Sequence, residues 1–126
     1  MSRIRRLRSL HGEQFRYELL KRDGRIQFRK FQESGREHYH LRIWLEAPAD
    51  TLARITKVSY RLHPSFSRPV RTSNDREHRF AIEIWTWGLF EIEATAYFDD
   101  GSADSTSFYL GYELPEDDGH TYVDVG

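Results

Sequence analysis

The sequence predicts an all-β domain, and three observations carry this prediction. From Phe15 onward, apolar and polar residues alternate with a period of two in short runs, as in strands with one buried face. The runs end at Gly, Pro, Asn and Asp residues, which favour turns. The chain has 126 residues, no cysteine, and three Trp, seven Tyr and eight Phe, so its stability must come from packing one core. Seven to eight short antiparallel strands at this spacing indicate an immunoglobulin-like β-sandwich.

The first part of the chain is expected to form a ribbon followed by a long strand. Apolar residues share one face over residues 15–19, and Asp23-Gly24 is a two-residue hairpin signal. A first ribbon is therefore expected over residues 15–32. Residues 39–45 alternate again until an Ala-Pro-Ala-Asp sequence ends the run. No helix is expected anywhere in the chain.

The second part repeats the pattern of short strands joined by turns. Residues 58–62 form a strand that ends in the segment 63–69, where two prolines prevent further pairing and indicate a structured loop. Alternation returns over residues 80–84, 90–98 and 106–114. The predicted core residues are Tyr60, Leu62, Ile82, Ile84, Ile92, Ala94, Phe98 and Phe108.

Charge is distributed unevenly along the chain. Residues 1–30 contain ten Lys or Arg and three acidic residues, whereas residues 91–126 contain ten acidic residues and no Lys or Arg. We therefore expect a basic N-terminal arm over residues 1–12, a β-sandwich over 13–114 and an acidic C-terminal tail over 115–126. No run has the ~18 apolar residues of a membrane helix, and no secretory signal is present, so a cytoplasmic protein without membrane contact is expected.

A nucleic-acid interface is one hypothesis for the basic start of the chain, which contains Arg3, Arg5, Arg6 and Arg8. Such an interface predicts a steep loss of affinity with salt. The net charge of −1 argues against it, because nucleic-acid-binding domains are usually basic as a whole.

A metal site is a second hypothesis. His38 and His40 are two residues apart on an expected strand and so project to the same side, with His63 and His78 as additional ligands. No acidic third ligand occurs at a recognisable spacing, so no metal is predicted.

Catalytic signatures are also weak. Glu91 and Glu93 project from one face of a single strand, which is more typical of surface residues than of a glycosidase pair. Ser65 follows His63 but lacks a nucleophile elbow, and no glycine-rich phosphate loop occurs. The sequence therefore predicts a binding module without cofactor or enzymatic activity.

Two segments resemble a known family. Residues 58–71 contain the run Leu-His-Pro-Ser-Phe-Ser-Arg-Pro-Val-Arg, which is similar to the LHxSFxxPxR signature of YEATS domains. Trp87-Gly88-Leu89-Phe90 is similar to the GWGxF segment of that family, and Trp87 follows Phe66 by 21 positions. The similarity spans about residues 39–114. The wording of the first motif is most like the prokaryotic branch of the family.

The resemblance implies a reader or sensor domain with an aromatic slot between two loops. Carried over by position, His63, Ser65 and Phe66 match the first loop of the slot, and Trp87 and Phe90 match the second. The implied ligand is an acylated lysine, in a peptide, or a similar small, flat acyl amide. Trp87 and Phe66 are expected to face each other across about 7 Å, which is twice the contact distance of stacked carbon atoms, and Ser65 is expected to hydrogen-bond the amide.

The alternative is a structural or protein-interaction module. In that hypothesis Trp44, Trp85 or the strand edges pack against a partner protein, and the loop aromatics only cover the end of the core.

Overall fold

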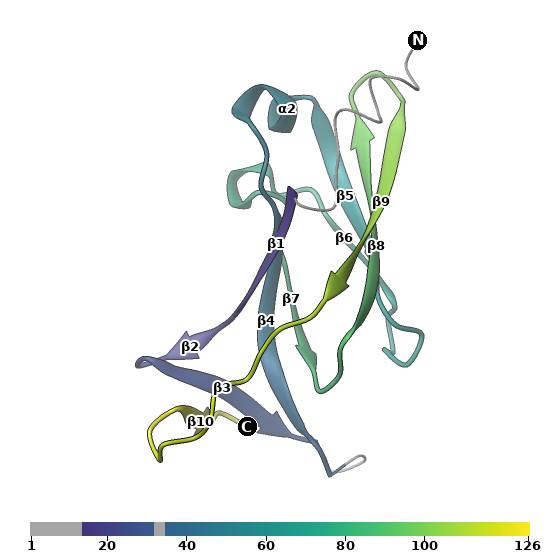
Figure 1. Ribbon diagram of the computed structural model, residues 1–126. Coiled ribbons are helices and arrows are strands. Elements are labelled where there is room, and N and C mark those ends of the chain that lie inside the picture. The colour runs from purple at the N-terminus through teal and green to yellow at the C-terminus, as the bar shows by residue number, and fades with distance from the viewer. Residues whose placement is uncertain (1–13, 32–34) are drawn as a thin grey trace.

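Two β-sheets pack face to face, as the sequence predicts. The computed structural model describes residues 14–31 and 35–126. The strands in this part of the chain are β1 (Phe15–Leu19), β2 (Lys21–Arg22), β3 (Arg25–Lys30), β4 (Glu37–Leu45), β5 (Ile55–Arg61), β6 (Val70–Ser73), β7 (Ile82–Thr86), β8 (Phe90–Phe98), β9 (Ala103–Leu110) and β10 (Tyr122–Asp124). One sheet has six strands, in which β1, β4, β3 and β10 follow one another while β2 pairs with β3 and β7 with β4. The second sheet has the order β6-β5-β8-β9 (Figure 1).

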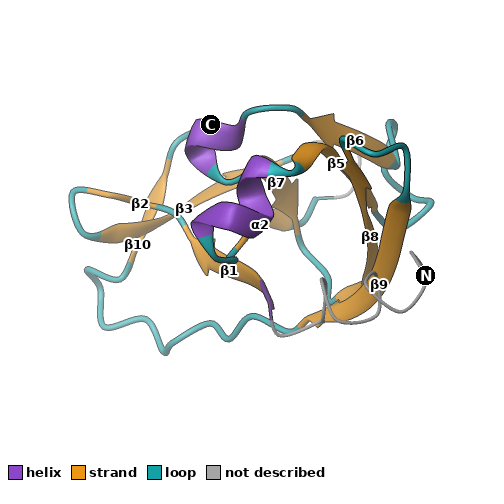
Figure 2. Cartoon of the chain, turned by 90° about the horizontal axis from the view of Figure 1, so that it is seen from above, coloured by secondary structure: helices purple, strands orange, loops and turns teal. Residues whose placement is uncertain are grey.

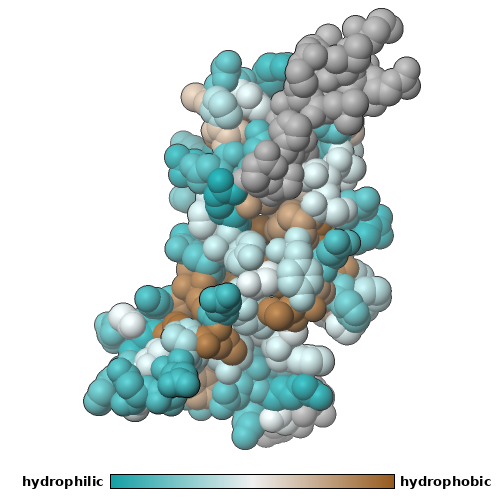
Figure 3. Space-filling view, in the orientation of Figure 1, coloured by the Kyte–Doolittle hydropathy of each residue, from teal (hydrophilic) through white to brown (hydrophobic). Residues whose placement is uncertain are grey.

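The core lies between the two sheets and follows the predicted alternation. Six of the eight predicted core residues are buried, and Ile82 and Phe108 are partly buried and pack against the same cluster. Burying a large aliphatic side chain stabilises a fold by roughly 1.5–3 kcal/mol. The six buried residues are Tyr60, Leu62, Ile84, Ile92, Ala94 and Phe98. In the space-filling view, apolar surface is concentrated in the middle of the face shown, between more polar margins (Figure 3).

The prediction of one continuous ribbon over residues 15–32 is wrong. The turn at Asp23-Gly24 joins only β2 to β3, whereas β1 leaves this hairpin and pairs with β4, with Phe15 opposite Leu45. β4 has nine residues, so one of its edges pairs with two strands, with β3 along its first half and with β1 along its second half. This arrangement lets the Phe15 ring stack on Phe108 of the other sheet, 5.1 Å between centroids.

Within the residues that the structure describes, two short helical turns depart from the expectation of no helix. The first is α2 (Ala49–Ala53), which begins after Pro48, and the second is the 3-10 turn η2 (Arg76–His78). The carboxylate of Asp75 accepts the backbone N–H of His78 and so caps the second turn.

The C-terminal segment contributes a strand. Residues 122–124, inside the expected acidic tail, form β10 and pair in parallel with β3, Tyr122 being opposite Ile26. Figure 2 shows β2, β3 and β10 together on the side away from β8 and β9. No helix in the described residues is long and apolar enough to cross a membrane.

One side of the sandwich remains open. Within the described residues, β7 pairs with β4 alone and β6 with β5 alone, so each leaves an unpaired edge. A hollow of about 270 Å³ lies between these two edges, lined by Arg71 from β6 and Glu83 from β7 among others. The loops that follow β5 and β7 are at one end of this open side.

Candidate functional site

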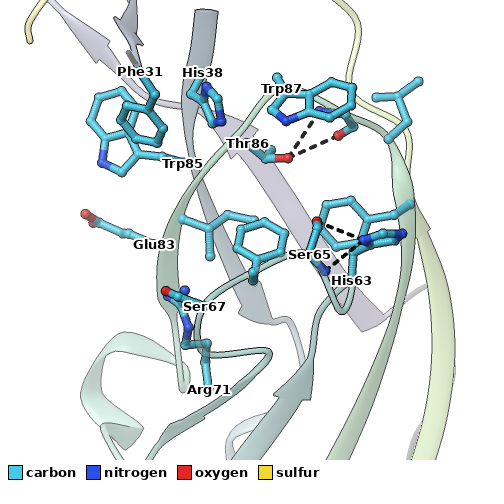
Figure 4. Close-up of a pocket in the computed structure, with 15 residues that line it drawn as sticks. Phe31, His38, His63, Ser65, Ser67, Arg71, Glu83, Trp85, Thr86 and Trp87 are labelled. Carbon is cyan, nitrogen blue, oxygen red and sulfur yellow. Dashed lines mark hydrogen bonds between the residues drawn. The ribbon is translucent and has the colours of Figure 1, made fainter. Parts of the chain in front are cut away.

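A pocket of about 650 Å³ lies at the end of the open side (Figure 4). It brings together the five residues that the sequence analysis selected, although they come from loops far apart in the chain. In Figure 4, Ser65 and His63 lie on one side of the pocket, and Trp87 and Thr86 on the other. The five residues are His63, Ser65, Phe66, Trp87 and Phe90.

The first loop holds Ser65 against the ring of His63. The backbone N–H of Ser65 donates to His63 Nδ1 at 3.1 Å, so this nitrogen carries no proton. The Ser65 hydroxyl, 2.8 Å from the same nitrogen, must therefore donate to it as well. The lone pairs of the Ser65 oxygen remain able to accept a hydrogen bond from a ligand. Ser65 is exposed and is not turned into the core.

The base of the pocket is aromatic. Phe90, the first residue of β8, is buried, and its ring lies 5.5 Å from that of Phe66 and 6.2 Å from that of His63. The backbone N–H of Phe66 donates to His63 O, and Leu62 N–H donates to Pro69 O, so the loop is closed by its own backbone. These contacts fix the position of Phe66 without a contribution from a ligand.

The second loop presents Trp87 to the solvent. The hydroxyl of buried Thr86 accepts the backbone N–H of Gly88 at 3.2 Å and so closes a tight turn around Trp87. The Trp87 side chain is 51% exposed, and the guanidinium of Arg36 lies 4.1 Å from its ring centroid. This cation–π contact holds the indole at the mouth of the pocket.

Phe66 and Trp87 do not stack on each other. Among the ring contacts of residues 14–31 and 35–126, Phe66 packs on Phe90, and no contact joins Phe66 to Trp87. Both rings line the same pocket. The separation of about 7 Å that a bound amide requires stays a prediction.

Several lining residues were not selected from the sequence. Phe31 and His38, on the two sides of the β3–β4 turn, pack at 4.1 Å and line the pocket. Trp85, which the sequence analysis names as a partner-facing residue in its alternative hypothesis, also lines the pocket, with His40 stacked on its ring at 4.3 Å. Burial lowers the pKa of His40. The alternation in β4 and β7 does place His38, His40 and Trp85 on the outer face of their sheet, but it carries no sign that this face borders the loops.

The histidines considered as metal ligands each contact a different residue. His38 Nδ1 lies 3.1 Å from Arg36 O, and His40 Nδ1 lies 3.2 Å from Gln27 Oε1. His78 pairs with Asp75 at 2.7 Å, on a different surface of the protein. Within the part of the chain that the structure describes, no three His, Asp or Glu side chains gather as a metal site would require.

The carboxylates considered for catalysis lie on the outer face of β8, away from this pocket. Glu91 and Glu93 are both exposed, and Glu93 pairs with Arg61 at 3.5 Å. Their surroundings are those of surface residues.

Comparison with protein families identifies the chain. The model of the prokaryotic YEATS domain matches residues 39–111, which is more than half of the chain. The chain belongs to this family. The matched residues include both loops of the pocket and the strands that support them.

One known protein is similar to part of the chain. The chain is 37% identical over 60 residues to the transcription initiation factor TFIID subunit 14 of Schizosaccharomyces pombe, a match that covers 47% of this chain and 24% of that protein. The chain thus spans about a quarter of this relative's length.

Solved structures share the fold at low identity. The Yaf9 YEATS domain bound to H3K27ac gives a TM-score of 0.57 at 19% identity, over 80% of this chain and 70% of that one. The Yaf9 YEATS domain recognising an H3K122suc peptide gives 0.53 at 19%, over 77% and 66%. The yeast AF-9 homolog Yaf9 gives 0.53 at 23% identity, over 60% and 52%. At these identities the comparisons establish the immunoglobulin-like β-sandwich of the YEATS fold.

Proposed function

We propose that this pYEATS domain is a non-enzymatic reader that binds an acylated lysine, or a similar flat acyl amide, in the pocket between its two loops. The observation that carries the proposal is the gathering of the five motif residues around one pocket. The similarity to Yaf9 domains that bind acylated histone peptides agrees with it. The partner is a peptide or small molecule that carries the acyl group.

The chemistry of the pocket suits a neutral amide. Acylation removes the charge of lysine and leaves a planar group whose N–H can donate and whose faces can stack. Ser65 already donates its proton to His63, so its oxygen accepts the amide N–H. Trp87 offers an exposed ring to the amide plane while Arg36 holds that ring in place.

Isothermal titration calorimetry tests the proposal with two peptides of the same sequence, one with acetyl-lysine and one with unmodified lysine. We expect only the acetylated peptide to bind, and binding to be nearly independent of salt because the recognised group is neutral. Ser65→Ala removes one hydrogen bond and should weaken binding by about fivefold to tenfold.

Ser107→Ala is the matched control, because Ser107 is exposed on β9 and does not line the pocket. It should leave the affinity unchanged. Equal binding of the two peptides, or unchanged affinity in Ser65→Ala, would contradict the proposal.

A further inference from the structure

Arg71 is a charged residue on the inward side of an edge strand. In the β5–β6 pair it lies directly opposite Tyr60, and opposite residues of an antiparallel pair project to the same face. Tyr60 is buried in the core, but β6 is the edge of its sheet, so the Arg71 side chain reaches the open side of the sandwich. It lines both the main pocket and the smaller hollow between β6 and β7. Figure 4 shows Arg71 at the foot of the pocket, next to Ser67.

Its guanidinium is held in position by the loop. Arg71 Nε donates to the backbone O of Arg68 at 2.7 Å, and Arg71 Cζ lies 5.8 Å from the ring centroid of Phe66. The terminal Nη groups donate to no group in the described part of the chain. The four N–H donors of the two Nη groups are therefore held at a defined place beside the ring of Phe66.

No acidic side chain of the described residues pairs with this site. Within residues 14–31 and 35–126, neither Arg71 nor Arg68 pairs with a carboxylate. Glu83 is the acidic residue of the pocket lining, and its carboxylate is engaged by Arg42 Nη2 at 3.0 Å and His40 Nε2 at 3.3 Å. Among the described residues, no carboxylate forms an ion pair with the positive charge at the foot of the pocket.

Burial and the charge of Arg68 both disfavour the charged form of Arg71. Burial is the larger cause of a lowered pKa for the Arg71 guanidinium, and Arg68 is the second. An arginine remains protonated at neutral pH even so. A bound anion would compensate both effects, since it supplies opposite charge and accepts from the Nη groups.

We propose that Arg71, with Arg68 beside it, forms an anion subsite of the pocket and binds a carboxylate carried by the ligand. The inference rests on the proposed function, because the ligand is the acylated lysine bound by the two loops. The carboxylate has two sources. It ends the acyl chain itself, or it belongs to an acidic residue next to the acylated lysine.

Two matched pairs of peptides in calorimetry distinguish these sources. The first pair carries butyryl-lysine or succinyl-lysine in an uncharged sequence, so the two acyl chains have equal length and differ in the terminal carboxylate. The second pair carries acetyl-lysine flanked by Gln or by Glu. We expect the carboxylate member of one pair to bind about fivefold tighter, a preference that decreases as salt is raised.

Two single-charge variants locate the subsite. Arg71→Gln should abolish the preference for the carboxylate member, and Arg71→Lys should retain part of it because the charge remains. Arg61→Gln removes the same charge from the outer face of the same sheet, where Arg61 pairs with Glu93, and should keep the full preference. Circular dichroism and the melting temperature establish that each variant is folded.

The outcomes separate this inference from the function on which it rests. Binding of all four peptides without a preference overturns the anion subsite and leaves the acyl-lysine reader intact. Failure of every peptide to bind overturns both. If the preference survives in Arg71→Gln, with or without aggregation of that variant, Arg71 does not bind the carboxylate. Its role would then be that of an inward-pointing charge that prevents the edge strand from pairing with another molecule.

Discussion

The two sides of the sandwich are built differently. On the closed side, β1 and β9 come together, with the rings of Phe15 and Phe108 stacked at an interplanar angle of 4°. The hydroxyl of Tyr17 accepts the backbone N–H of Gly111 at 3.2 Å and adds a polar contact between the sheets. This side is sealed by aromatic packing.

On the open side, no strand in the described part of the chain pairs with the outer edges of β6 and β7, and the pocket lies at the end of the space between them. Here aromatic rings contact arginine side chains: the guanidinium of Arg36 lies over the ring of Trp87, and that of Arg71 lies near the ring of Phe66. One side of the sandwich thus contributes stability. The other keeps exposed rings and an arginine that pairs with no carboxylate of residues 14–31 and 35–126. We infer that substitutions on the two sides affect different properties.

The largest expected effect is on the closed side. Phe15→Ala removes a buried ring that also packs edge-on against Tyr60, and should lower the free energy of unfolding by about 3–5 kcal/mol. Chemical denaturation measures this loss. At a temperature where the variant is still folded, its affinity for acetyl-lysine peptide should equal that of the wild type. A loss of affinity in the folded variant would show that the two sides are coupled.

Trp87→Ala makes the opposite test on the open side. The indole is half exposed, so the melting temperature should change little, whereas affinity for acetyl-lysine peptide should fall about tenfold or more because a stacking surface is lost. Differential scanning fluorimetry and calorimetry measure the two quantities. A large fall in melting temperature with no peptide binding in the wild type would favour the structural or protein-interaction module instead.

The smallest expected effect is a pH dependence on the closed side. Tyr112, which follows Gly111, is buried, and burial raises its pKa to about 12. The unfolded chain then loses this proton near its ordinary value while the folded protein retains it. Stability is therefore complete below pH 10 and decreases as the pH rises toward 12.

Tyr112→Phe removes this contribution. Between pH 9 and pH 11 the wild type should lose about 1 kcal/mol more unfolding free energy than the variant. Urea denaturation at both pH values measures the difference. Identical losses in the two proteins would show that Tyr112 does not titrate differently in the folded state.

Much of the fold was predictable because alternation identifies buried faces. Val58, Tyr60 and Leu62 are all buried, and Ile92 and Ala94 on the neighbouring strand are buried with them. The pocket was predictable for a different reason. Its two loops carry motifs of the YEATS family, and strands that belong to both sheets of one sandwich bring the ends of those loops together.

Other parts of the structure depend on pairing, which alternation does not specify. The apolar face of residues 15–19 is compatible with either β3 or β4 as partner, and the stacking of Phe15 on Phe108 favours β4. Likewise, β10 has three residues and is too short to show an alternation of its own. It pairs with β3 because an edge of that strand is available for hydrogen bonding.

The sequence by itself therefore determined which residues face the core, that the chain forms a β-sandwich, and which two loops carry the candidate site. These are local properties, because a period of two and a motif are read within one segment. Only the tertiary structure decided which strands are neighbours, which side of the sandwich is sealed, and that Phe31, His38 and Arg71 border the pocket. Those features depend on how distant segments pack. The backbone edge of a strand can hydrogen-bond with any other strand, so the fit of the side chains decides which strand becomes its neighbour.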